Sequence, residues 1–304
     1  MRKTGIALLV TLFLLVTVTG VAFAITYGEP DTEHPHVGLV GFFDIDGNWM
    51  WRCSGTLLSD TVFLTAGHCT SPDFPANPDY APHSAMVWFG DKIELDPVLE
   101  KYPDLECYEK PPGKLKWTTY PCVGGIPGEP IANPLYKGLY IPDTHDVGVV
   151  ILEGPIPEEA GNDYGVLPPA GFLDELSVTN GADGVNFMSV GYGLNQVLPE
   201  TISLRERWFS VSFLINLTNA LTDGYNIQTS NNPGGWPDDP MAYSGGTCFG
   251  DSGGPLFYEV DEVTEYLVGI TSFGLNASCK GTDFAYRTDT ESFWEFIEGG
   301  EYFP

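Results

Sequence analysis

The chain has 304 residues, which is enough for one large domain or two domains of modest size. Its formal net charge of −28 argues against nucleic acid and against an anionic membrane surface as binding partners. The acidic composition favours solubility but does not by itself predict a fold.

The N-terminus predicts a signal peptide over residues 1–24. Two basic residues precede an apolar run at 6–16, and an Ala-Phe-Ala sequence ending at Ala24 is typical of a cleavage site. A membrane anchor is the alternative, but the apolar run is short for a membrane span. We therefore expect cleavage after Ala24, a secreted protein, and no membrane span after cleavage.

The pattern that follows predicts mostly short β-strands separated by turns. Apolar or alternating runs indicate strands at 37–43, 49–58, 62–65, 147–152, 186–193, 208–217, 255–258, 267–274 and 284–287. Residues 153–173 are rich in Pro, Gly and acidic side chains, as is typical of a connector. Residues 290–298 carry apolar side chains at helical spacing, which predicts a C-terminal amphipathic helix.

Residues 70–140 are rich in Pro, Tyr and acidic side chains and show the weakest pattern, with short strands indicated at 88–90 and 93–95. A surface insertion is the simpler interpretation, because long loops vary freely. A rim that shapes a substrate cleft is the alternative.

Six cysteines in an exported chain predict disulfide bonds. Cys107 and Cys122 most simply pair with each other. No Cys-x-x-Cys pair or suitable His spacing indicates zinc, so we expect neither a metal nor a cofactor.

Ser252 lies in a turn with unusual glycine content, Gly250-Asp251-Ser252-Gly253-Gly254, which leads into the strand at 255–258. Such a turn can expose a nucleophile with backbone N–H groups beside it. A glycine-rich hairpin is the alternative for an isolated motif.

The full Gly-Asp-Ser-Gly-Gly-Pro string is more specific, and it resembles the nucleophile segment of the chymotrypsin/trypsin family of serine endopeptidases. Two further segments resemble that family in the same chain order. These are Thr65-Ala66-Gly67-His68-Cys69 and Asp146-Val147-Gly148-Val149. The resemblance implies that Ser252 is the nucleophile, His68 the general base and Asp146 the acid that orients it, with the N–H groups of Gly250 and Ser252 as the oxyanion hole.

The resemblance also implies an all-β fold of two packed six-stranded antiparallel β-barrels with a C-terminal α-helix. We expect an N-terminal barrel over 25–155, carrying His68 and Asp146. A C-terminal barrel over 156–304 would carry Ser252, the specificity pocket and the helix.

Several finer features follow from the same resemblance. Cleavage after Ala24 would leave Ile25 as a new N-terminus, whose amine would pair with Asp251. Disulfides are implied between Cys53 and Cys69 and between Cys248 and Cys279.

The substrate pocket is implied to include Gly246, Thr247, Phe249, Ser272, Phe273, Gly274 and Asp283. Gly246 stands where family members that cleave after Lys or Arg carry an Asp. Two preferences therefore stay open. If Asp283 points into the pocket, basic residues are favoured; if it faces solvent, apolar residues are favoured.

The sequence thus predicts a secreted, monomeric serine endopeptidase acting on a protein or peptide substrate. A catalytically inactive binding protein on the same fold is the alternative, although such proteins usually lose a member of the triad. An esterase of the α/β-hydrolase type would need a base after the nucleophile. The last histidine of the chain is His145, which argues against it.

Overall fold

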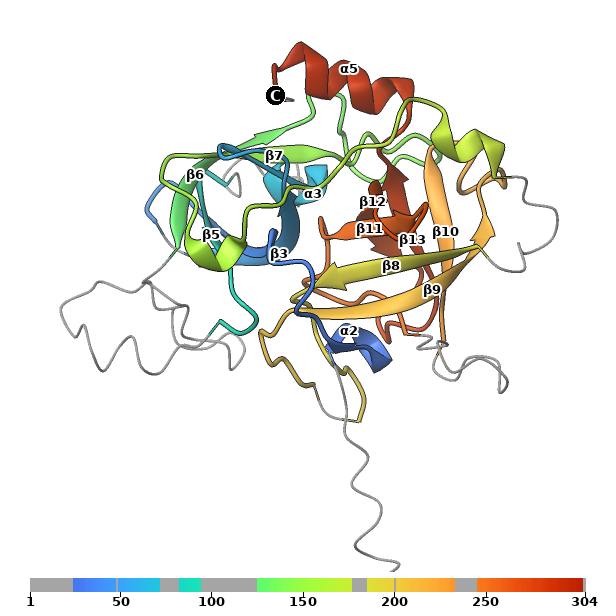
Figure 1. The fold of residues 1–304 in the computed structure, drawn as a ribbon, viewed down its shortest axis with the longest axis horizontal. Coiled ribbons are helices and arrows are strands. Elements are labelled where there is room, and N and C mark those ends of the chain that lie inside the picture. Colours follow the sequence, from blue (N-terminus) through green and yellow to red (C-terminus); the bar gives the residue numbers. More distant parts are fainter. Residues whose placement is uncertain are drawn as a thin grey trace, which may run out of the picture.

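The computed structural model describes residues 24–47, 49–71, 82–93, 125–176, 185–199, 201–232 and 245–302, and within them it contains two β-barrels side by side (Figure 1). The first barrel closes in the order β2-β3-β4-β7-β6-β5. Its strands are β2 (Val37–Phe43), β3 (Trp49–Leu57), β4 (Val62–Thr65), β5 (Ser84–Trp88), β6 (Ile126–Ala132) and β7 (Gly148–Leu152).

The second barrel closes through a pairing between its first two strands, in the order β8-β9-β10-β13-β12-β11. These strands are β8 (Asn186–Gly191), β9 (Trp208–Asn216), β10 (Asn226–Asn231), β11 (Pro255–Glu259), β12 (Glu265–Gly274) and β13 (Gly281–Arg287). Every strand pairing is antiparallel, which confirms the predicted fold class.

The apolar runs of the sequence form the barrel walls and fill the core. All seven residues of β2, which pairs with β3 and β5, are buried. One large apolar cluster joins the interior of the first barrel to side chains of the second, including Phe257 and Ile270. The two barrels therefore share buried apolar surface.

Strand β6 was not predicted, because it contains Pro127 and Pro130 and proline is rare inside a sheet. The pairing register explains how β6 accommodates them. Strand β5 pairs with residues 126–128 and β7 with residues 128–132, so the two partners overlap only at Gly128. Among the named strands, Pro127 therefore pairs only with β5 and Pro130 only with β7, and prolines in sheets are mostly found where pairing is one-sided.

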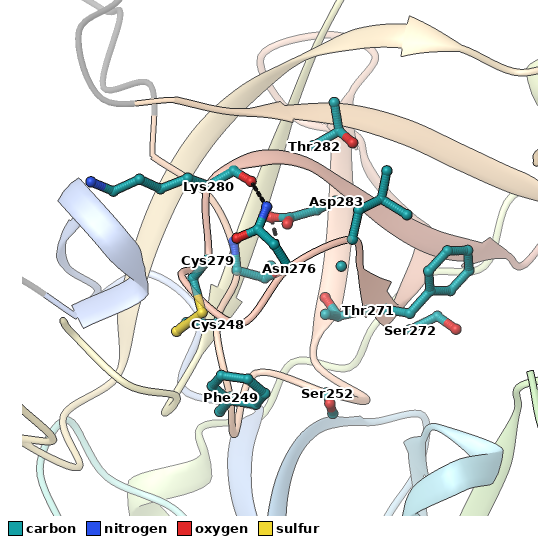
Figure 2. Close-up of a pocket in the computed structure, with 14 residues that line it drawn as sticks. Cys248, Phe249, Ser252, Thr271, Ser272, Asn276, Cys279, Lys280, Thr282 and Asp283 are labelled. Atoms are coloured by element: carbon teal, nitrogen blue, oxygen red, sulfur yellow. Dashed lines mark hydrogen bonds between the residues drawn. A yellow bond between two sulfur atoms is a disulfide. The ribbon is translucent and has the colours of Figure 1, made fainter. Parts of the chain in front are cut away.

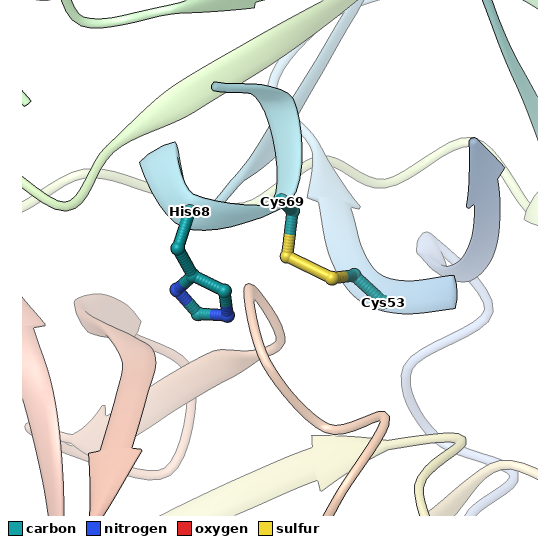
Figure 3. Close-up of side chains that lie close together, drawn as sticks. All are labelled: Cys53, His68 and Cys69. Carbon is teal, nitrogen blue, oxygen red and sulfur yellow. A yellow bond between two sulfur atoms is a disulfide. The ribbon is translucent and has the colours of Figure 1, made fainter. Parts of the chain in front are cut away.

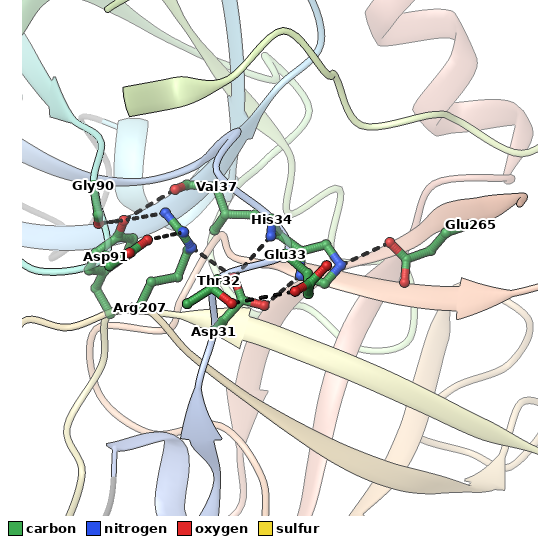
Figure 4. Close-up of polar contacts among 10 residues, drawn as sticks. Asp31, Thr32, Glu33, His34, Val37, Gly90, Asp91, Arg207 and Glu265 are labelled. Atoms are coloured by element: carbon green, nitrogen blue, oxygen red, sulfur yellow. Dashed lines mark hydrogen bonds and ion pairs between the residues drawn. The ribbon is translucent and has the colours of Figure 1, made fainter. Parts of the chain in front are cut away.

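The N-terminal segment joins the two barrels through ion pairs that involve the buried side chains of Asp31, His34 and Arg207 (Figure 4). It contains α2 (Ala24–Tyr27), whose interior backbone is not helical, and the short strand β1 (Glu29–Pro30), which pairs with β9 as a seventh strand. Asp31 accepts a 2.7 Å bond from Arg207 of the second barrel, and Arg207 also bonds Asp91 after β5. The His34 ring lies between Asp31 and Glu265 of β12, at 2.6 and 3.1 Å.

The C-terminal helix α5 (Glu291–Gly299) begins at Thr290, which caps it by accepting a hydrogen bond from the N–H of Phe293. Phe293 and Ile297 are fully buried. The helix lies across the top of the molecule in Figure 1, and it lines a groove together with residues 131–135 of the first barrel. The predicted C-terminal helix is thus confirmed.

Three short helical turns complete the described elements: α3 (Gly67–Thr70), η2 (Glu158–Ala160) and η3 (Phe172–Glu175). The last two lie in the connector between the barrels. Within the described ranges, no helix combines the length and apolar character needed to cross a membrane.

Candidate active site

Asp146 holds His68 in a fixed position. His68 lies in α3, which follows β4, and Asp146 lies just before β7 (Gly148–Leu152), which pairs with β4. Asp146 is fully buried, and its two oxygens accept the backbone N–H of His68 at 2.7 Å and the ring Nδ1 at 2.8 Å. Ser272 of β12 donates a third hydrogen bond, at 2.5 Å. These contacts orient the imidazole so that Nε2 is turned away from the carboxylate.

A disulfide anchors the same turn to the barrel. Cys69, next to His68, is bonded to Cys53 of β3, and Figure 3 shows the His68 ring projecting from the turn that this bond holds. The atoms of Cys53, His68 and Cys69 come close enough to suggest a metal site. The two sulfurs are bonded to each other, so they are not thiolates and cannot serve as metal ligands.

The glycine turn packs against the residues that precede His68. Gly253 has φ +80°, and a Cβ built there would lie 2.0 Å from the Oγ1 of Thr65 and 2.7 Å from the N of Ala66. Only glycine permits both the backbone conformation and this approach. The glycine turn therefore brings Ser252 to the end of β4, beside α3, which carries His68. Ser252 is partly exposed.

The N–H groups of Gly250 and Ser252 have no hydrogen-bond acceptor in the described part of the chain. The neighbouring N–H groups do have acceptors: those of Asp251, Gly253 and Gly254 bond to carbonyls at 2.8 to 3.0 Å. Gly250 has φ +101°, a conformation that favours glycine. Two unpaired amides with one residue between them can bind the oxygen of a reacting carbonyl.

Asp251 is buried beneath the turn and accepts hydrogen bonds from the N–H groups of Gly193 and Cys248, at 2.7 and 2.8 Å. No side chain of the described residues forms an ion pair with it. Burial raises the pKa of Asp251 to about 7, against the opposing effect of these two N–H groups. Ile25, its expected partner, is fully buried within the continuous chain, so its nitrogen is a peptide nitrogen here.

A cavity of about 230 Å³ opens beside Ser252 (Figure 2). Of the predicted pocket residues, it is lined by Thr247, Phe249, Ser272, Phe273, Gly274 and Asp283. The predicted disulfide between Cys248 and Cys279 is present and borders it. Phe249 is 55% exposed at the rim, and the Phe273 ring stacks on Phe284 at 4.5 Å.

Gly246, which was predicted to be a pocket residue, does not line the cavity. It forms a β-bridge with Thr26, and a Cβ there would lie 2.2 Å from Cγ of Asn231. Asn231, at the end of β10, was missed by the sequence analysis because an Asn in a polar strand carries no motif. Its Nδ2 donates to both oxygens of Asp283, at 2.9 and 2.8 Å, and to the carbonyl of Thr247 at 3.0 Å.

Asp283 lies in the wall of the cavity, with 6% of its surface exposed. Its Oδ2 accepts hydrogen bonds from the N–H and hydroxyl of Thr247, at 2.6 and 2.9 Å, and from Asn231. Among the described residues, its Oδ1 accepts only from Asn231. This oxygen lies 3.6 Å from the position of a Cβ on Gly274, which lines the cavity. A carboxylate oxygen accepts about two hydrogen bonds, so Oδ1 has capacity for another donor.

Asp283 also lacks a cationic partner in the described part of the chain. Lys280 lines the same cavity, but Figure 2 shows its side chain extending away from Asp283. Burial raises the pKa of Asp283 to about 6, although the hydrogen bonds from Asn231 and Thr247 lower it. Asp31 and Asp289, in contrast, are equally buried but each pairs with an arginine.

Comparisons with known proteins found a matching family model and a similar fold. The model of the family described as Trypsin matches residues 219–297, a segment that includes Ser252 and the pocket. The solved structure of HL collagenase superposes with a TM-score of 0.59 at 17% sequence identity, covering 91% of this chain and 98% of that chain. None of the curated protein sequences compared with the chain matches it.

The fold is that of the chymotrypsin-like proteases. The family match and the shared fold together support the chymotrypsin/trypsin-like family of serine endopeptidases, as the three sequence motifs predicted. Cys107 and Cys122 lie outside the described residues, so their predicted pairing stays a prediction. The same holds for the signal peptide over residues 1–24, of which only Ala24 is described.

Proposed function

We propose that the protein is a secreted serine endopeptidase that hydrolyses peptide bonds through an acyl-enzyme. The arrangement of Asp146 carries this proposal. A fully buried carboxylate fixes both the backbone and the ring of His68, and its third bond, from Ser272, ties it to the strand that lines the cavity beside Ser252. A structural aspartate would not need to orient an imidazole at the edge of a cleft.

In this mechanism the Oγ of Ser252 attacks the substrate carbonyl carbon while Nε2 of His68 takes the hydroxyl proton. The carbonyl π bond breaks, and the resulting oxyanion accepts hydrogen bonds from the N–H groups of Gly250 and Ser252. His68 then gives its proton to the leaving amine as the C–N bond breaks. Water, activated by the same imidazole, releases the acid from Ser252. Asp146 stabilises the imidazolium in both steps.

Asp251 supports a role for the N-terminus in forming the active turn. A buried carboxyl group whose pKa is raised to about 7 is ionised more readily when a cation is placed beside it. Cleavage after Ala24 would supply the ammonium of Ile25. Thr26 already forms a β-bridge with Gly246, just before Cys248 in the chain, so the new terminus would begin close to the turn.

Asp283 supports a preference for Lys or Arg at the P1 position of the substrate. A buried carboxylate without a counter-ion is costly, and a basic P1 side chain would supply the missing charge at Oδ1. Cleavage after apolar residues is the competing preference, and it is favoured by the exposed Phe249 at the rim. We favour the basic preference, because an unpaired buried carboxylate in the cavity wall determines the P1 side chain more strongly than an aromatic ring at the rim.

Peptide hydrolysis by the purified mature protein tests the proposal. Wild type should cleave a library of peptides, and Ser252→Ala should lose turnover while its circular dichroism and urea unfolding stay unchanged. An inactive binding protein would show no hydrolysis in wild type either, and retained hydrolysis by the alanine variant would rule out Ser252 as the nucleophile.

A further inference from the structure

Ser54 of β3 lies directly beneath the nucleophile turn and is fully buried. Its hydroxyl donates to the carbonyl of Gly250 at 2.9 Å, and its backbone N–H donates to the carbonyl of Ser252 at 2.8 Å. It therefore contacts, from the first barrel, both residues whose N–H groups form the proposed oxyanion hole.

The hydroxyl of Ser54 has its direction fixed by a third contact. The backbone N–H of Tyr192 donates to its Oγ at 3.0 Å. A hydroxyl has one proton and two lone pairs, so an Oγ that accepts from Tyr192 retains its proton for Gly250. The Oγ also lies close to Gly191, where an added Cβ would come within 3.1 Å of it.

These contacts fix the peptide unit between Gly250 and Asp251. Its carbonyl accepts from Ser54, and its N–H donates to the carbonyl of Cys248 at 3.0 Å. This peptide unit stands between the two amides of the oxyanion hole, so its plane sets the angle between their N–H vectors. Donors that stabilise a transition state must be aimed in advance, and small misplacements are costly.

We propose that Ser54 is a positioning residue that aligns the two oxyanion-hole amides through the Gly250 and Ser252 carbonyls. The inference rests on the proposed serine-protease function. Without the hydroxyl, the Gly250 carbonyl and the Tyr192 N–H both lose a buried partner, and the peptide can rotate to recover one. The lost stabilisation lowers kcat rather than substrate affinity, because the two oxyanion-hole N–H groups stabilise the transition state more than the carbonyl of the bound substrate.

The test compares Ser54→Ala with Thr56→Val as a matched control. Thr56 lies two residues along the same strand and is also buried, but its Oγ1 has no hydrogen-bond partner in the described part of the chain. The assay measures kcat and KM on one peptide substrate, per active site titrated with a fluorophosphonate. It also measures inhibition by a peptide boronic acid, which forms a tetrahedral adduct, and by the matching product peptide.

We expect kcat of the Ser54→Ala variant to fall about 10-fold, less than the roughly 10²–10³-fold loss of a whole donor. Boronate affinity should fall by a similar factor, whereas KM and product affinity stay within about twofold. Thr56→Val should match wild type. Ser54→Gly leaves space for a water between Gly250 and Tyr192, so its kcat should lie between those of the alanine variant and wild type.

Equal kcat in wild type and both Ser54 variants overturns the proposal. The proposal is also overturned if the titrated active fraction falls while kcat per active site stays at the wild-type value. Ser54 would then affect only how much of the protein folds. If Ser54→Ala does not fold, the glycine variant decides by the same readouts. A wild type that hydrolyses nothing is a different result, because it removes the proposed function itself.

Discussion

Replacing Asp283 by Asn tests the pocket most sharply, because it removes one charge and keeps the shape. A P1 ammonium about 4 Å from the carboxylate, at an effective dielectric constant of about 20, gains about 4 kcal/mol. That energy corresponds to about 10³-fold in kcat/KM. Desolvation of the substrate cation offsets part of it, so we expect the variant to lose about 10²–10³-fold on substrates with Lys or Arg at P1.

The assay uses fluorogenic peptides that differ only at P1, carrying Lys, Arg, Leu or Phe, at pH 8. The Asp283→Asn variant should keep kcat/KM on Leu and Phe substrates within about threefold of wild type. Glu262→Gln, which removes an exposed charge on the loop after β11, is the control and should change neither class. A variant that still prefers Lys and Arg would refute the assignment of Asp283, as would a wild type that cleaves only after apolar residues.

The same carboxyl group makes the preference depend on pH. Its folded-state pKa is raised to about 6, so the ionised form dominates above pH 6 and the neutral form below it. The ratio of kcat/KM for Lys over Leu substrates should therefore fall about 10-fold between pH 8 and pH 5. Taking the ratio cancels any effect of pH that both substrates share. A ratio that stays constant across this range would contradict the account.

Two further predictions concern stability. Gly253→Ala should lose about 3 kcal/mol or more of unfolding free energy, because its Cβ would overlap Thr65. Gly224 has a similar φ of +82°, but an added Cβ there would have nothing within 4 Å, so Gly224→Ala should lose only about 1 kcal/mol. Equal losses of unfolding free energy for the two variants in urea melts would rule out the overlap as the cause. Burial lowers the pKa of His34, but its two carboxylate partners outweigh this and raise it to about 9. The stabilisation by protonated His34 is thus fully present below about pH 6.5 and is lost as pH rises to 9, by about 3 kcal/mol, whereas His34→Gln should show a flatter unfolding profile over that range.

The sequence predicted the fold class because the residues that carry the family's motifs are also those whose geometry is most constrained. Position 253 is an example: it requires glycine because its φ is positive and because its backbone lies so close to the Thr65 side chain that a Cβ would not fit. Most strands were also predicted, because a buried run such as β7 is nearly continuous in apolar residues. Strand β6 was missed because the tolerance for its prolines depends on the register of two neighbouring strands, which is not a local property.

The residues that tune the site were harder to predict than those that would react. Asn231 and Ser54 make hydrogen bonds to residues far away in the chain, at positions where Asn and Ser are common for many reasons. Whether Asp283 faces the cavity could not be decided from spacing, because the loop between β12 and β13 has no motif that sets the register. In the structure Asp283 pairs with Thr229 of β10, and it lines the cavity.

The most direct test of the central claim is to locate the reactive serine by mass spectrometry. The purified mature protein is treated with a fluorophosphonate and then digested and mapped. We predict one adduct, on Ser252, which forms in the native protein and is absent when labelling is done in denaturing urea. An adduct on a different serine, or none in protein that is folded by circular dichroism, would contradict the proposed mechanism.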